Sequence, residues 1–273
     1  MVSSGKDQSS DSVQEGNWQA ETIRHVLLTN DDGFFAPGLQ ALYQALLQDP
    51  GYIVSIVAPE GQRSASGHAI TLFDPLFVTE HAIEGKGRGF AVRGTPSDCV
   101  KLAIQGQLVP VPDMVISGIN FGPNLGTDVF YSGTVSAAME AVLLGVPAIA
   151  VSLASFEYGN FEASAAWLAK FLKEKSINFR QGLLNINFPG LPFQQWQGIR
   201  VVRLGKAQYA NVFESRIDPR GRRYFWQGGT LEPENSDDTD LGAIAQGFVT
   251  ITPMHSDLTD YQKLKELAED SFS

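Results

Sequence analysis

The amino-acid sequence predicts an α/β protein, and three observations support this prediction. Two apolar runs, at residues 26–29 and 52–58, flank a segment with helical periodicity, which is the pattern of a β-α-β unit. Further buried-strand patterns alternate with amphipathic segments as far as about residue 190. Polar, glycine-rich stretches follow several strand patterns, at the edge where open α/β sheets bind ligands. We therefore expect a three-layer α/β/α, Rossmann-like sheet.

Composition limits the classes to which the chain can belong. Its 273 residues suffice for one large α/β domain, or for one domain with an appendage. The net charge of −10 argues against a nucleic-acid polymer or an anionic membrane as partner, and no apolar stretch is long enough to span a bilayer. Cys99 is the only cysteine, which excludes an intramolecular disulfide. Residues 1–21 are polar and lack the apolar core of a signal peptide, so we expect a disordered tail and a cytoplasmic protein.

Hydrophobic periodicity and turn residues place the elements along the chain. We expect strands at residues 26–29, 52–58, 76–79, 89–92, 112–117, 147–153, 183–188 and 248–254. We expect helices at residues 38–48, 161–175 and 258–269, and one that follows residue 134. A further helix is expected to begin at Pro96, with Thr95 as N-cap and Asp98 closing a capping box. Capping explains this last motif by itself, and a functional role is the alternative.

The pattern changes beyond about residue 190 to short extended pieces. We expect residues 22–190 to form a Rossmann-like catalytic domain, and residues 191–273 to form a C-terminal extension with a hairpin, a late strand and a terminal helix. The hairpin carries Tyr224-Phe225-Trp226 after a Gly- and Arg-rich turn. Exposed aromatic hairpins are typical of subunit contacts, although a local core explains them equally well. The extension is therefore the expected site of oligomerisation.

Two adjacent carboxylates, Asp31 and Asp32, follow the first predicted strand. Neighbouring carboxylates repel one another, and gathering them without a counter-charge pushes one toward the neutral form. A hard divalent cation removes that penalty and prefers oxygen ligands. The alternative is a simple turn, because Asn-Asp-Gly sequences are common turn formers. We interpret Asp31 and Asp32 as the start of a metal site because of the loops that follow.

Three later loops are expected to reach the same edge of the sheet. The first carries Ser64, whose hydroxyl can complete an oxygen shell, and Arg63, which can meet a phosphate. The next contains Asn120 and Asn124 among several glycines, so its backbone can lie close to a ligand. The third, Ser132-Gly133-Thr134, precedes a helix and combines hydroxyls, free N–H groups and the positive end of the helix dipole. That combination is a competent phosphate site.

Taken together, these segments resemble the SurE family of survival-protein phosphatases and nucleotidases. The similar stretches are Thr29-Asn30-Asp31-Asp32-Gly33, Ala36-Pro37-Gly38, Val57-Ala58-Pro59, Arg63-Ser64, Gly94-Thr95-Pro96-Ser97-Asp98, Ser117-Gly118-Ile119-Asn120, Gly122-Pro123-Asn124-Leu125-Gly126, Tyr131-Ser132-Gly133-Thr134 and Thr252-Pro253-Met254-His255. They run from about residue 23 to about residue 260. Each motif is weak alone, but their order at edge-of-sheet loops is specific.

The resemblance implies a site and an activity. It implies a divalent metal, Mg²⁺ or Mn²⁺, held by Asp31, Asp32, Ser64 and Asn120, and phosphate contacts from Asn124, Ser132, Gly133 and Thr134. The implied reaction is metal-assisted hydrolysis of nucleoside monophosphates by a 5′-nucleotidase, with 3′-nucleotidase and exopolyphosphatase activities as further candidates. Asp31 or Asp32 is the expected proton acceptor. The family also forms homodimers and homotetramers.

Other classes fit the residues less well. An aspartyl-phosphate phosphatase spaces its two carboxylates as Asp-x-Asp, whereas Asp31 and Asp32 are adjacent. A serine esterase would need a Gly-x-Ser-x-Gly elbow, which is missing from the sequence. A dehydrogenase would carry a Gly-rich phosphate turn after its first strand. A non-catalytic sensing or scaffold module remains the alternative from a different class, and the retention of Asp32 and Asn120 argues against it.

Overall fold

The computed structural model describes residues 25–157, 159, 161–174, 182–210, 212–234 and 236–269. The predicted tail at residues 1–21 lies outside the described residues, as does the last position of the helix expected at 161–175. Within the described ranges, no helix combines the length and the apolar character that crossing a membrane requires.

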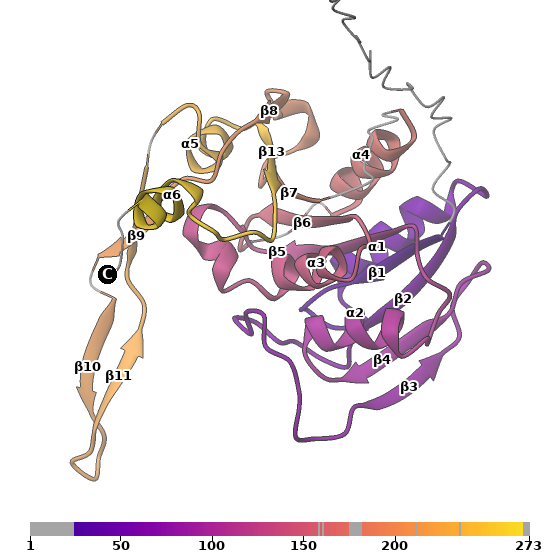
Figure 1. Ribbon diagram of the computed structural model, residues 1–273, viewed down its shortest axis with the longest axis horizontal. Coiled ribbons are helices and arrows are strands. Elements are labelled where there is room, and N and C mark those ends of the chain that lie inside the picture. Colours follow the sequence, from indigo (N-terminus) through magenta and orange to yellow (C-terminus); the bar gives the residue numbers. More distant parts are fainter. Residues whose placement is uncertain are drawn as a thin grey trace, which may run out of the picture.

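A nine-stranded sheet forms the centre of the molecule (Figure 1), with the order β3-β4-β2-β1-β5-β6-β7-β13-β8. Its strands are β1 (His25–Thr29), β2 (Ile53–Pro59), β3 (Phe77–His81), β4 (Gly89–Arg93), β5 (Met114–Phe121), β6 (Ala148–Ala154), β7 (Leu183–Pro189), β8 (Ile199–Val201) and β13 (Val249–Met254). The six strands from β4 to β7 in this order are parallel. Strand β3 is antiparallel to β4, and β13 is antiparallel to β7.

Helices cover both faces of the sheet, which confirms the predicted three-layer α/β/α class (Figure 1). On one face lie α1 (Pro37–Leu47) and α4 (Phe161–Glu174), whose leucines Leu42 and Leu168 are fully buried in one apolar cluster. On the other face lie α2 (Pro96–Gln105) and α3 (Gly133–Leu143), where Val100 and Val135 belong to a second cluster. Cys99 of α2 is buried in the same second cluster.

Helix α2 begins as its capping residues predict. The Thr95 hydroxyl accepts a hydrogen bond from the Asp98 N–H at 3.0 Å, and the Asp98 carboxylate accepts one from the Thr95 N–H at 2.9 Å. Pro96 occupies the first turn, where its missing N–H leaves no helical bond unmade. Helix α3 begins in a similar way, because the Ser132 hydroxyl accepts from the Val135 N–H at 3.1 Å.

Strand β5 continues beyond the end that the sequence suggested. We expected residues 112–117 to be extended and the glycine at 118 to break the strand, but β5 runs on to Phe121. Gly118 has a φ of 140° and the register against β6 shifts between Ser117 and Asn120, so this glycine forms an irregularity inside the strand. Asn120 therefore lies on the strand end and not in the following loop.

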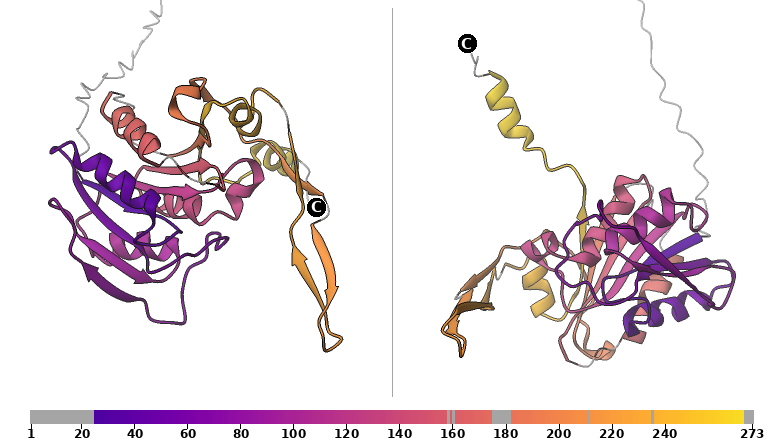
Figure 2. Two further views of the ribbon diagram at one scale, coloured as in Figure 1. Left: turned by 180° about the vertical axis from the view of Figure 1, so that it is seen from behind. Right: turned by 90° about the horizontal axis from the view of Figure 1, so that it is seen from below.

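The C-terminal segment contributes to the sheet and also extends away from it. Strand β13 inserts between β7 and β8, so residues on both sides of the predicted boundary at 190 share the central sheet. The predicted hairpin is present as β10 (Phe213–Ile217) and β11 (Arg223–Gln227), which project from the body (Figures 1 and 2). The remaining elements are β9 (Ala207–Ala210), β12 (Thr230–Pro233), α5 (Asp240–Ala245), α6 (Tyr261–Glu269) and two short 3-10 helices, η1 (Gly126–Phe130) and η2 (Phe193–Gln195).

Candidate active site

The two predicted carboxylates lie at the point where the strand order of the sheet reverses. Asp31 and Asp32 follow Asn30 at the end of β1, which has β2 on one side and β5 on the other. In open α/β sheets the chain leaves such a pair of strands in opposite directions and opens a crevice at their carboxyl ends. Asn120, near the end of β5, comes to the same place from the neighbouring strand.

Asp31 is buried, with only 6% of its surface exposed. The Thr134 hydroxyl, from the first turn of α3, donates a hydrogen bond to its Oδ1 atom. Burial raises the pKa of this carboxyl to about 6, the Thr134 hydrogen bond opposes the rise, and the nearby charge of Asp32 adds to it. Desolvation therefore matters more here than the mutual repulsion of the two carboxylates.

Asp32 links the loop after β1 to the end of β5. Its Oδ2 atom accepts a hydrogen bond from the Phe121 N–H at 3.1 Å. Partial burial raises the pKa of Asp32, and the hydrogen bond from Phe121 opposes that rise. The carboxylate is less buried than that of Asp31, so it is the more accessible of the pair.

The preceding residue, Asn30, builds the turn that holds both carboxylates. Its fully buried side chain accepts from the Gly33 N–H at 3.1 Å and donates to the Gly33 carbonyl at 2.9 Å. The segment from Asn30 to Gly33 is thus a turn closed by the Asn30 side chain, as the simpler interpretation of the sequence held. That turn does not exclude a site, because it is what places Asp31 and Asp32 at the sheet edge.

The serine loop, which we define as residues 60–72, passes next to Asp31. The Arg63 N–H donates to the main-chain carbonyl of Asp31 at 2.7 Å. Ser64 follows immediately and is exposed, and its hydroxyl accepts from the Gln62 amide at 2.9 Å. The Ser66 hydroxyl, which we did not single out from the sequence, is buried without a hydrogen-bond partner among the described residues.

Gly133 allows the serine loop, α3 and Asp31 to approach closely. A Cβ atom added there would lie 2.9 Å from both the Asp31 Oδ2 atom and the Ser66 Oγ atom. No larger residue fits without displacing one of these groups. This close approach explains why position 133 is a glycine, which the sequence alone did not reveal.

The Ser132-Gly133-Thr134 segment forms the start of α3, as predicted. Its two hydroxyls have partners inside the protein, since Ser132 caps the helix and Thr134 binds Asp31. The first-turn N–H groups of a helix have no intrahelical acceptor, and the positive end of the dipole lies there. What α3 presents beside Asp31 is therefore main-chain N–H groups more than side-chain hydroxyls.

Asn124 is the centre of a buried polar cluster. Its N–H donates to Asn187 Oδ1 at 2.9 Å, its side-chain amide donates to Ser152 Oγ at 2.7 Å, and its carbonyl accepts from Asn185 and Asn187 at 2.8 and 3.0 Å. Asn185 and Asn187 are fully buried on β7. They were missed in the sequence, although two polar residues at alternate positions of an apolar strand share one face and need partners.

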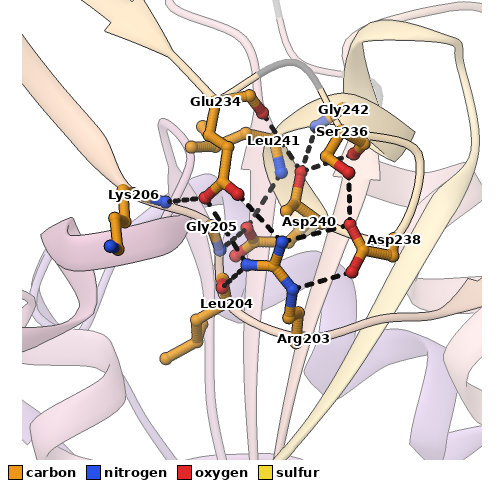
Figure 3. A network of polar contacts seen from close by, with 11 residues as sticks. Arg203, Leu204, Gly205, Lys206, Glu234, Ser236, Asp238, Asp240, Leu241 and Gly242 are labelled. Atoms are coloured by element: carbon orange, nitrogen blue, oxygen red, sulfur yellow. Dashed lines mark hydrogen bonds and ion pairs between the residues drawn. The ribbon is translucent and has the colours of Figure 1, made fainter.

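The loop that carries Asn124 is also fixed to the C-terminal segment. The buried Asp240 carboxylate accepts from the Gly126 N–H at 2.8 Å and from the Gly205 and Leu241 N–H groups at 2.8 and 2.9 Å. Figure 3 shows Asp240 beside Arg203, whose guanidinium pairs with Glu234 and Asp238. Residues after 200 thus hold a loop of the site in place.

The donor set can accommodate a divalent cation. Within the described ranges, no group of three or more His, Cys, Asp or Glu side chains could hold a metal ion, so a cation here would rely on the two carboxylates and neutral oxygens. Two observations fit that arrangement: the raised pKa of Asp31, and the unpartnered Ser66 hydroxyl, which Gly133 allows to pack close to the Asp31 carboxylate. Hard cations take such mixed oxygen sets. The ligand set of Asp31, Asp32, Ser64 and Asn120 stays a prediction.

Comparisons with known proteins agree on one family. A family model described as "Survival protein SurE" matches residues 26–211. The 5′-nucleotidase SurE of Desulfitobacterium hafniense (strain DSM 10664 / DCB-2) is 62% identical over 245 residues, covering 90% of this chain and 96% of the relative. That of Carboxydothermus hydrogenoformans is 48% identical over 89% of this chain and 94% of its own. The crystal structure of SurE protein from Aquifex aeolicus has a TM-score of 0.74 at 38% identity, covering 90% of this chain and 98% of the other.

Proposed function

The chain belongs to the SurE family, and from this premise we propose that it is a 5′-nucleotidase, a phosphoric monoester hydrolase that converts nucleoside monophosphates to nucleoside and phosphate. The observation that carries the proposal is the buried carboxylate of Asp31, which receives a hydrogen bond from the first turn of α3 at the switch point of the sheet. An acidic pair at a ligand-binding edge of the sheet is suited to hold a divalent cation, and such a cation assists phosphate chemistry.

We further propose that the enzyme depends on Mg²⁺ or Mn²⁺ held by Asp31, Asp32, Ser64 and Asn120. When bound, such a cation neutralises charge on the phosphoryl group and favours attack by water. Two carboxylates offset most of the charge of the cation, and the hydroxyl and the carboxamide leave it electrophilic. A cation would also remove the energetic penalty of an ionised, buried Asp31.

The remaining residues bind and orient the substrate. The first-turn N–H groups of α3 would receive the phosphate, because an anion is stabilised at a helix N-terminus. Thr134 keeps the Asp31 carboxylate in one orientation through its hydrogen bond. Asn124 holds the shape of its loop through the cluster with Ser152, Asn185 and Asn187, and its contact with phosphate remains part of the proposal. Either Asp31 or Asp32 is the proton acceptor.

Further properties belong to the same proposal. The same site would accept 3′-nucleotides and short polyphosphates, because the groups described here recognise the phosphate and not the leaving group. We propose a cytoplasmic enzyme that forms a homodimer or homotetramer through the C-terminal extension, supported by the exposed aromatic side chains of β10 and β11.

Phosphate release tests the proposed reaction. The purified chain would be assayed with 5′-AMP, 3′-AMP, short polyphosphate and p-nitrophenyl phosphate, each with Mn²⁺, with Mg²⁺ and with EDTA. We expect release from 5′-AMP that EDTA abolishes and added metal restores. Release that persists in EDTA would contradict metal dependence. No release under any condition would favour a sensing or scaffold module.

A further inference from the structure

The serine loop has attachments that the proposed reaction does not use. Between Arg63 and Thr71 a main-chain hydrogen bond ties it to Asp31. Two side chains outside the proposed ligand set, Asp98 and Glu140, tie it to α2 and α3. We propose that Asp98 and Thr95 of the α2 N-terminus, together with Glu140 of α3, act as a clamp that positions the serine loop beside Asp31. This inference rests on the proposed metal site, whose ligand Ser64 the loop carries.

The first part of the clamp is the Asp98 carboxylate, which is 1% exposed. Its Oδ1 atom accepts from the Thr71 N–H at 2.9 Å, and its Oδ2 atom accepts from the Thr71 hydroxyl at 2.6 Å. The Thr95 hydroxyl donates to the Ala69 carbonyl at 2.7 Å. Both side chains of the capping box therefore have a second partner on the serine loop.

These second partners are not needed to cap a helix. A capping box is complete once the Thr95 hydroxyl meets the Asp98 N–H and the Asp98 carboxylate meets the Thr95 N–H. The bonds to Thr71 and Ala69 add a connection across 26 or 27 residues of sequence. These bonds give the capping motif a possible second role beside capping, which is the alternative that the sequence left open.

The second part of the clamp is Glu140, in the middle of α3. Its carboxylate is 4% exposed and pairs with the His68 Nε2 atom at 2.8 Å and with the Lys101 ammonium at 3.0 Å. A carboxylate in the interior needs such partners. His68 lies on the serine loop and Lys101 on α2, so Glu140 joins three segments at one point.

The clamp and the site share the same rigid elements. Thr134 of α3 holds the Asp31 carboxylate, and Glu140, two turns later on α3, holds His68. The Gly67 N–H also donates to the Tyr131 carbonyl, just before α3, at 3.1 Å. Ser64 and Ser66 lie between these fixed points, so few conformations remain open to them. Pre-positioned neutral ligands bind a cation more tightly than mobile ones, because less ordering accompanies binding.

The decisive variant is Thr71→Val, which removes the hydroxyl donor, keeps the side-chain shape and leaves the capping box intact. In the metal-free protein, we expect faster hydrogen exchange at residues 63–71 by about tenfold. We expect Mn²⁺ affinity to fall by about tenfold, with kcat at saturating Mn²⁺ nearly unchanged. Thr71→Ser retains the hydroxyl and should restore both properties. His68→Ala should act in the same direction through Glu140.

A matched control separates the clamp from general destabilisation. Glu80→Gln removes an exposed pair with Arg88, 3.0 Å apart and away from the serine loop, and should change neither exchange at residues 63–71 nor Mn²⁺ affinity. Wild-type exchange and Mn²⁺ affinity in both Thr71→Val and His68→Ala would overturn the clamp. If the wild-type protein bound no Mn²⁺, the proposed metal site would fail, while the exchange rates would still decide whether the clamp exists.

Discussion

The sheet edge around Asp31 and the C-terminal hairpin differ in which kinds of side chain are buried and which are exposed. At the sheet edge, polar groups are buried and paired, as the fully buried Asn30 and the clustered Asn124 illustrate. In the hairpin, apolar groups are exposed: Phe225 and Trp226 are 58% and 59% accessible to solvent, and every residue of β10 and β11 is exposed. Helix α6 likewise has no buried residue and stands away from the body (Figure 2).

This difference in burial indicates whether each region finds its contacts within the chain or in another molecule. Apart from hydroxyls such as that of Ser66, the buried polar groups described in the first region find their partners within the same chain, so we expect a single copy to build the site. Exposed aromatic groups in the second region are the kind of surface that other molecules cover. We therefore expect substitutions at the sheet edge to act on activity and folding, and substitutions in the hairpin to act on assembly.

The largest effect is expected from Asp31→Asn. Loss of a metal ligand should lower turnover by about a thousandfold or more, because a bound cation contributes several kcal/mol of charge stabilisation. The fold should persist, since an amide oxygen can still accept from Thr134. Phosphate release and circular dichroism measure the two properties. Asp49→Asn, in an exposed pair with Lys173, serves as control. Activity near that of the wild type in Asp31→Asn would disprove the assignment.

Two glycine substitutions compare the sheet edge and the hairpin by their effect on the free energy of unfolding. A Cβ at Gly38 would lie 2.0 Å from the Ile119 carbonyl oxygen, so Gly38→Ala should lower the free energy of unfolding by about 3 kcal/mol through overpacking between α1 and β5. At Gly228, beside the hairpin, no atom lies within 4 Å of an added Cβ. Gly228→Ala should change stability by less than about 0.5 kcal/mol. Urea denaturation compares them, and equal losses would contradict this account.

The pH dependence of metal-free stability tests the burial of Asp31. Its folded pKa is raised from 3.8 to about 6, so between these values the unfolded chain has released a proton that the folded chain keeps. Rising pH therefore favours unfolding in this window, by up to about 3 kcal/mol in total. In EDTA, Asp31→Asn should lack this component and be more stable than the wild type at pH 7. Parallel stability curves for the two proteins would refute the raised pKa.

The smallest effect on the stability of one copy is expected in the hairpin. Trp226→Arg replaces an exposed aromatic residue and should change the unfolding free energy of the monomer by about 0.5 kcal/mol or less. It should nevertheless shift the molar mass measured by light scattering toward the monomer, because the hairpin is the proposed subunit contact. An unchanged mass at every protein concentration would count against that role.

Local signals made much of the fold predictable from the sequence. The α2 start follows from Thr95, Pro96 and Asp98, since capping depends on neighbours three residues apart. The strand before Asp31 follows from a short apolar run that ends in turn residues. The order of loops along the chain was sufficient to bring Asp31 and Asn120 to one edge of the predicted sheet.

Long-range pairing was not accessible from the sequence. The insertion of β13 between β7 and β8 joins residues that are 50 or more positions apart, and periodicity contains no information on partners. Asp240 and its partner Gly126 are 114 positions apart, and Thr71 and its partner Asp98 are 27 positions apart. The continuation of β5 through Gly118 was missed because a glycine signals a bend without saying whether a strand resumes after it.

The most direct test of the central claim, that Asp31 and its neighbours hold a divalent cation, is a titration of the metal-free protein with Mn²⁺ followed by electron paramagnetic resonance. We predict one saturable site in the wild type that Mg²⁺ competes for and that Asp31→Asn lacks, with Asp49→Asn binding as the wild type does. Equal Mn²⁺ binding by the wild type and Asp31→Asn would contradict the account.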